Sequence, residues 1–112
     1  MAAIFALMLL GGAIPTIHAS PLTPQAQAKM DQAINLSWSG QEHECLPANA
    51  RITVTILVPS EGRPDKYDVN GSLCAARQIE AIDRFLLSPR AQFRQVQEPT
   101  RFIFSVRLVI PE

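Results

Sequence analysis

The feature that most constrains the fold is a long alternation of apolar and polar residues near the C-terminus. From Arg101 to Ile110, apolar side chains occupy every second position: Phe102, Phe104, Val106, Leu108 and Ile110. Successive side chains of a β-strand point to opposite faces, so the pattern predicts a strand with one apolar face. Because that face must be buried, the strand has to join a sheet that is covered on one side.

A second alternating run, from Ile52 to Val58, predicts another strand, and this one is rich in β-branched residues. The sequence Pro59-Ser60-Glu61-Gly62 favours a turn because its glycine tolerates positive φ. A further strand is expected from Asp65 to Val69. The two strands and the turn therefore predict a β-hairpin.

Two segments show the three-to-four-residue apolar spacing of helices. Thr23 can cap the first, Pro24 suits its first position, and the segment is expected to end near Ser37. Its apolar face consists of Ala26, Met30, Ala33, Ile34 and Trp38. Ser72 can cap the second segment, which Ser88-Pro89 ends. The apolar face of the second comprises Ala75, Ile79, Ile82 and Leu86, with Phe85 beside it.

The expected element order is helix, strand, strand, helix, strand. The simplest packing is a two-layer α+β domain in which both helices cover the apolar face of a three-stranded antiparallel sheet, with the order α-β-β-α-β. Whether the last strand lies in the middle or at an edge of this sheet cannot be derived from the alternation. The chain of 112 residues has room for one such domain.

The first residues have the character of a secretory signal. Residues 1–14 are almost all apolar, Pro15 follows, and Ala19 is a small residue suited to a cleavage site. We therefore expect residues 1–19 to be a signal peptide, cleaved after Ala19, and residues 20–112 to be the exported domain. The segment lacks the Lys or Arg usual at the start of a signal, so a buried helix or a retained short anchor stays an alternative. Membrane contact is expected only if the segment is not cleaved.

Export would place the two cysteines in a compartment that favours disulfide formation. Cys45 and Cys74 are the only cysteines, and oxidising compartments favour their pairing. A disulfide closing this loop is worth about 3–4 kcal/mol in the chain-entropy model. Their spacing is not the C-x-x-C of a redox-active pair. We expect a structural disulfide.

Composition and motifs argue against most catalytic and nucleic-acid functions. The ten basic and ten acidic side chains balance, whereas nucleic-acid-binding domains usually carry a basic excess. The loop Glu42-His43-Glu44-Cys45 lacks the second ligand pair of a metal site. The carboxylate pairs Asp65 with Asp68 and Glu80 with Asp83 carry no sign of a sugar cleft. We expect no enzyme, no metal or other cofactor, no small-molecule substrate and no nucleic-acid partner.

Four features along the chain resemble the C-terminal periplasmic domains of the TonB/TolA family. They are a helix ending in a tryptophan (AINLSW), a hairpin with a P-x-x-G turn (ITVTILVPSEGRPDKYDV), a helix after Gly-Ser (GSLCAARQIEAIDRF) and a late aromatic strand (FIFSVRL). The matching stretch runs from about Gln27 to Ile110. Because TolA-like domains often carry cysteines at places comparable to Cys45 and Cys74, the resemblance is closer to TolA.

The resemblance implies a periplasmic, non-enzymatic domain that binds other envelope proteins by adding their strands to its sheet edge. Exposed strand edges offer unpaired backbone groups to such partners. We take the last strand as the candidate partner-binding strand, with the residues Arg101, Ile103, Ser105, Arg107 and Val109. Energy-transducing members have a long spacer that this sequence does not show, so a role in energy transduction or transport is left open.

Two other classes of function stay open. One is a structural subunit of a cell-envelope machine for secretion or conjugation. The other is a small secreted enzyme or inhibitor that uses the loop from Glu42 to Cys45. A basic run, Arg84, Arg90, Arg94 and Arg101, could also bind acidic partners, although such spacing more often serves solubility.

Overall fold

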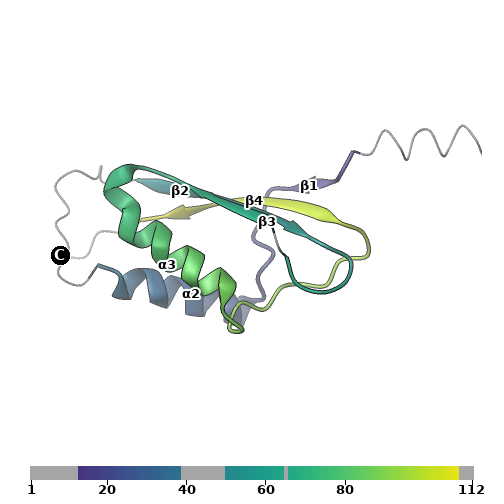
Figure 1. The fold of residues 1–112 in the computed structure, drawn as a ribbon, viewed down its shortest axis with the longest axis horizontal. Helices are drawn as coiled ribbons and strands as arrows, with labels where there is room; N and C mark the ends of the chain where they lie inside the picture. Colours follow the sequence, from purple (N-terminus) through teal and green to yellow (C-terminus); the bar gives the residue numbers. More distant parts are fainter. Residues whose placement is uncertain (1–12, 39–49, 65, 109–112) are drawn as a thin grey trace, which may run out of the picture.

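A computed structural model of the chain describes residues 13–38, 50–64 and 66–108 (Figure 1). The described elements are, in chain order, β1 (Thr16–Ile17), α2 (Pro24–Leu36), β2 (Arg51–Val58), β3 (Lys66–Asn70), the 3-10 turn η1 (Leu73–Ala75), α3 (Ala76–Leu87) and β4 (Thr100–Arg107). Within these residues the domain has α+β architecture, with two α-helices against one mixed sheet, in the order β-α-β-β-α-β.

The sheet has four strands in the order β1-β4-β2-β3. β2 pairs antiparallel with both β3 and β4, and Val54 lies opposite both Val69 and Phe104. The expected antiparallel set of three strands is thus present, with β2 at its centre. The expectation that the sheet has only these strands is wrong, because β1 pairs with β4 in parallel and makes the sheet mixed. A two-residue strand has no alternation to detect, and β1 lies inside the segment expected to be a signal peptide.

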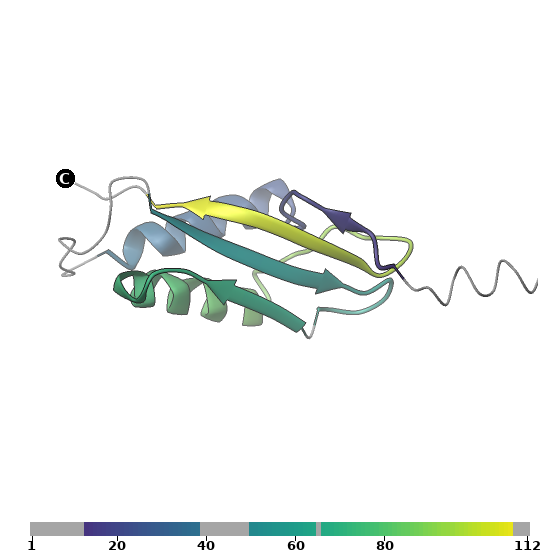
Figure 2. The ribbon, with the colours of Figure 1, turned by 90° about the horizontal axis from the view of Figure 1, so that it is seen from above.

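Both helices cover one face of the sheet, as Figure 2 shows from the sheet side. Alternate residues of β2 supply the centre of the core on that face: Ile52, Val54, Ile56 and Val58 are all buried. The helices contribute the apolar residues that the spacing predicts, such as Met30 on α2 and Ile82 on α3, both 0% exposed. Burying this shared apolar surface is the main force that holds the two layers together.

The helix starts follow from local hydrogen bonding. At α2 the hydroxyl of Thr23 accepts a hydrogen bond from the backbone N–H of Ala26, at 3.3 Å. Ser72 accepts from the N–H of Cys74 at 3.2 Å, which caps η1 and not α3. The second helical segment therefore opens with a 3-10 turn before the α-helix begins at Ala76.

A short clamp joins the chain before α2 to the connection before β4. The N–H of Thr23 donates to the carbonyl of Gln92 at 3.0 Å, and the N–H of Arg94 donates to the carbonyl of Pro21 at 2.7 Å. Leu22, 1% exposed, forms an isolated bridge with Phe93. After β1 the chain runs through this clamp to the start of α2. β1 therefore pairs with the first half of β4 only.

Candidate functional site

The candidate site is the edge of β4 that faces away from β2. The N–H of Leu108 donates to the carbonyl of Ala50 on the β2 side, whereas the N–H of Arg101 donates to the carbonyl of Pro15 on the β1 side. Backbone groups alternate in direction along a strand, so odd-numbered residues of β4 turn their N–H and C=O groups away from β2. These are the described members of the predicted partner-binding set: Arg101, Ile103, Ser105 and Arg107.

The first half of this edge is already paired. Thr16 lies opposite Arg101, and Ile17 lies opposite Phe102, in parallel register. The guanidinium Nη1 of Arg101 also lies 3.4 Å from the hydroxyl oxygen of Thr16. The backbone of Arg101 is therefore already paired while β1 is in place. Its role in binding a partner stays a prediction.

The second half of the edge has no strand beside it in the part of the chain that the structure describes. β1 ends at Ile17, and Figure 2 shows it beside the first part of β4 only. Ser105 and Arg107 are exposed, and Ile103 is half-buried. The outward N–H and C=O groups of Ser105 and Arg107 can thus accept an added strand. Val109, the last member of the predicted set, lies outside the described residues.

A groove of about 380 Å³ runs beside this open half. Its lining consists of Gln27, Asp31, Ile34 and Asn35 from α2 and Ser105, Val106 and Arg107 from β4. The amide of Gln27 donates to a carboxylate oxygen of Asp31 at 3.2 Å. A strand added at the edge would point alternate side chains into this groove. There the carboxylate of Asp31 could accept hydrogen bonds from them, and the guanidinium of Arg107 could donate.

Two side chains near β3, at the other edge of the sheet, have raised pKa values: Tyr67 on β3 and Asp83 on α3. Burial raises the pKa of the Asp83 carboxyl, and the nearby charge of Asp68 raises it further. Burial also raises the pKa of the Tyr67 phenol, with the charge of Asp83 as the second cause. These groups lie where α3 contacts β3. No groove with an open strand beside it is described at this edge, so we take β4 as the candidate edge.

Most of the other side chains that the sequence offered for catalysis or metal binding cannot be placed. Glu42, His43, Glu44, Cys45 and Asp65 lie outside the described residues. Glu80 forms an ion pair with Arg84, one turn further along α3. No group of three potential metal ligands occurs among residues 13–38, 50–64 and 66–108. Neither described helix is long and apolar enough to cross a membrane.

The structure describes one of the two cysteines. Cys74 is disulfide-bonded and half-buried beside the core. Because Cys45 lies outside the described residues, its pairing with Cys74 stays a prediction.

The predicted basic run does not form one patch. Arg84 and Arg90 lie on the helix layer, whereas Arg101 lies on the open face of the sheet, because its neighbour Phe102 points into the core. The residue that sequence reasoning missed is Arg77, which lines the same groove as Arg84 and Arg90. The seven-residue spacing of Arg77 and Arg84, two helical turns, could have indicated that they share a face.

Comparisons of the chain with protein-family models, with curated proteins and with solved structures found no match. The described residues form a small α+β domain, and among them no strand lies beside the second half of β4.

Proposed function

We propose that this chain is a protein-interaction domain that binds other proteins by strand addition. More specifically, we propose a periplasmic domain of TonB/TolA-like fold, exported by residues 1–19 and directed at envelope proteins. The sequence features that resemble the TonB/TolA domains support the family, and the geometry of β4 supports the mode of binding.

The observation that carries the proposal is that β4 already accepts an extended segment at this edge. The backbone of Pro15 and Thr16 pairs with Arg101, which is a small intramolecular example of strand addition. The same edge continues past β1 to Ser105 and Arg107, with the groove against α2 alongside. In such binding, main-chain hydrogen bonds supply affinity, and the fit of the partner's side chains in the groove supplies specificity.

Signal cleavage after Ala19 would enlarge the proposed site. The exported chain would lose β1, so the outward backbone groups of Arg101 and Ile103 would join those of Ser105 and Arg107. The clamp would survive, because Pro21, Leu22 and Thr23 follow the cleavage point. Mass spectrometry of the exported protein should find Ser20 at its N-terminus.

A proline substitution tests the mode of binding. The N–H of Ser105 faces away from β2, so Ser105→Pro removes an outward donor without removing a hydrogen bond between β2 and β4. Ser105→Ala is the matched control, since it changes the side chain and keeps the N–H. In pull-downs from envelope extracts, Ser105→Pro should lose the captured proteins and Ser105→Ala should keep them.

The same experiment separates the other classes of function. Capture of the same proteins by both variants, each with a native circular dichroism spectrum, would rule out strand addition at this edge. Co-purification of the unmodified chain with a large assembly would favour a structural subunit of an envelope machine.

A further inference from the structure

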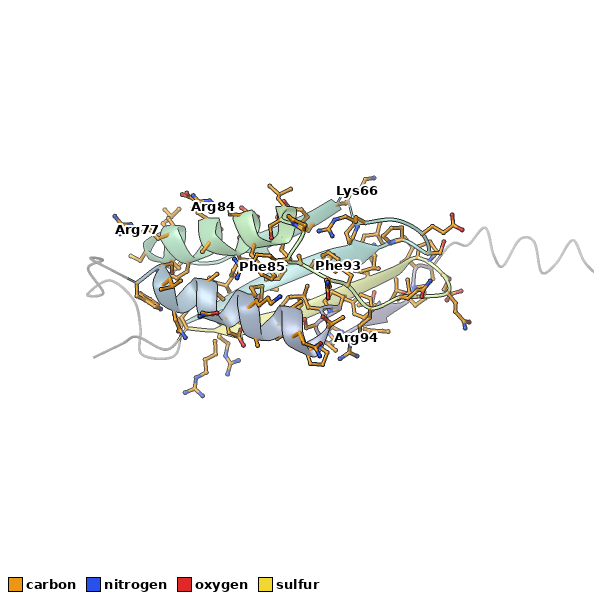
Figure 3. All side chains as sticks on the ribbon, turned by 90° about the horizontal axis from the view of Figure 1, so that it is seen from below. Lys66, Arg77, Arg84, Phe85, Phe93 and Arg94 are labelled. Carbon is orange, nitrogen blue, oxygen red and sulfur yellow. The ribbon has the colours of Figure 1, made fainter. Side chains whose placement is uncertain are left out.

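A second groove, about 630 Å³ in volume, lies between α2 and α3 on the layer of the domain away from the sheet. Figure 3 looks onto this layer, with Phe85 between the helices and Arg77 and Arg84 along α3. The groove is lined by Ala33, Leu36 and Ser37 of α2, by Arg77, Glu80, Ala81, Arg84 and Phe85 of α3, and by Ser88 and Arg90 after it. It is separate from the edge of β4, with which it shares no residue.

Small side chains create the groove and apolar ones line it. Ala33 on α2 and Ala81 on α3 leave the space between the helices unfilled. Phe85 lies buried at the base, and Leu36 is 71% exposed at the rim. Leu36 therefore extends the apolar surface of Ala33, Ala81 and Phe85 to the outside of the groove.

The rim of the groove carries excess positive charge. Among the described residues, Arg84 and Arg90 line it together with Arg77, and the carboxylate that lines it, Glu80, is paired with Arg84. That pair is exposed on both sides, so its exchange for another carboxylate costs little free energy. The guanidinium of Arg90 lies over the ring of Phe85, 5.6 Å from the ring centre, and so joins the charged rim to the apolar base.

From this complementarity we propose that the groove between α2 and α3 docks an acidic amphipathic helix of a partner protein. The apolar side of that helix packs against Leu36, Ala81 and Phe85, and carboxylates on its flanks pair with Arg84 and Arg90. A helix suits the site because the groove lies between two helices and is open to solvent along its rim. An acyl chain, in contrast, is held best in an enclosed cavity.

Designed peptides test the proposal on the full chain. One probe is an 18-residue helical peptide with leucines at positions i, i+4, i+7 and i+11 and glutamates on the flanks. A second peptide has lysines in place of the glutamates, and a third has the composition of the first in scrambled order. Fluorescence anisotropy should show the acidic helix binding at least tenfold more tightly than either of the others, with an affinity that falls as salt is added.

Charge-reversal variants locate the binding. Arg84→Glu and Arg90→Glu should each weaken binding of the acidic peptide at least fivefold. Arg107→Glu, on the edge of β4, is the matched control and should leave binding unchanged. Ala81→Leu fills the groove without a change in charge and should also weaken binding. Circular dichroism checks that each variant is folded.

Several results would overturn the proposal. They are no binding of the acidic peptide, equal binding of the acidic and lysine peptides, or an equal loss of binding in Arg107→Glu and Arg84→Glu. Binding that persists in Ala81→Leu would also contradict it, because the apolar part of the site would then lie elsewhere. None of these results bears on strand addition at β4, which the Ser105 variants test separately.

Discussion

The backbone N–H of Arg101 donates to the carbonyl oxygen of Pro15 at 2.8 Å, and this bond ties the start of β4 to a segment 86 positions earlier in the chain. It makes β1 the fourth strand of the sheet. The same segment has the sequence character of a cleavable signal, and cleavage after Ala19 would remove this strand from the sheet.

Removal of residues 1–19 should expose the first half of β4. The amide of Arg101 should exchange its hydrogen faster in the chain starting at Ser20 than in the full chain, because its acceptor, the carbonyl of Pro15, is gone. The amide of Leu108, which donates to Ala50, should keep its protection and serves as the control. Hydrogen exchange followed by NMR measures both. An unchanged rate at Arg101 would mean that β1 does not protect this edge in solution.

Two neighbouring residues of β2 should differ sharply in their contribution to stability. Ile56 is 0% exposed beneath the helices, whereas Leu57 is half-buried on the open face of the sheet. Ile56→Ala should lower the free energy of unfolding by about 2–5 kcal/mol, because it removes buried apolar surface and leaves a cavity. Leu57→Ala should cost about 1 kcal/mol. Urea denaturation compares the two, and similar losses would contradict the assignment of faces.

The stability of the domain should respond to the charge of Asp83. The folded-state pKa of this carboxyl is raised above its ordinary value of 3.8, so the folded state binds the proton more tightly than the unfolded state. The resulting contribution to stability is fully present below pH 3.8 and is lost as the pH rises through the raised folded pKa. Asp83→Asn should therefore stabilise the domain at neutral pH, and its advantage should shrink as the pH falls from the raised folded pKa of Asp83 toward 3.8.

Tyr67 offers a second readout of the same contact. Because the charge of Asp83 helps to raise the pKa of the Tyr67 phenol, Asp83→Asn should lower that pKa toward 10.0. Ultraviolet absorption during an alkaline titration follows the phenol directly. Glu80→Gln, one turn away on α3, is the control and should leave the pKa of Tyr67 in place. An unchanged titration in Asp83→Asn would show that burial alone causes the shift.

The predicted disulfide gives a test that depends on redox conditions. Cys45→Ser should lower the melting temperature in oxidising buffer, since a bridge over this loop is worth about 3–4 kcal/mol in the chain-entropy model. In strong reductant the variant and the unmodified chain should melt at nearly the same temperature. Thiol titration of the native chain should find no free thiol. Equal melting temperatures in oxidising buffer would mean that Cys45 and Cys74 are not joined.

Local patterns anticipated most of the fold. The helix predicted from Pro24 is α2, and its end at Leu36 lies one residue from the expected end. The alternation from Ile52 to Val58 corresponds to the buried and uncovered sides of β2. The open face of β4, with Arg101, Ser105 and Arg107, also follows from alternation. These predictions succeeded because backbone geometry sets the direction of each side chain relative to its neighbours, whatever the rest of the chain does.

The pairing of β1 and the groove between the helices could not be read in the same way. Thr16 and Ile17 carry no strand pattern, and they join the sheet through pairing with Arg101 and Phe102, far along the chain. Arg77 and Arg90 come together with Leu36 only because α2 and α3 lie side by side on the sheet. Each of these features consists of contacts between residues far apart in the sequence.

The sequence by itself determined the two α-helices and the strands β2, β3 and β4, and which side of each is buried. Hydrophobic periodicity carries that information because it reflects the repeat of a single element. Only the tertiary structure decided that β2 is the central strand, that β1 covers half of β4, and that an arginine-rimmed groove opens between α2 and α3. These depend on which apolar faces meet when the whole chain packs, and no local repeat encodes that choice.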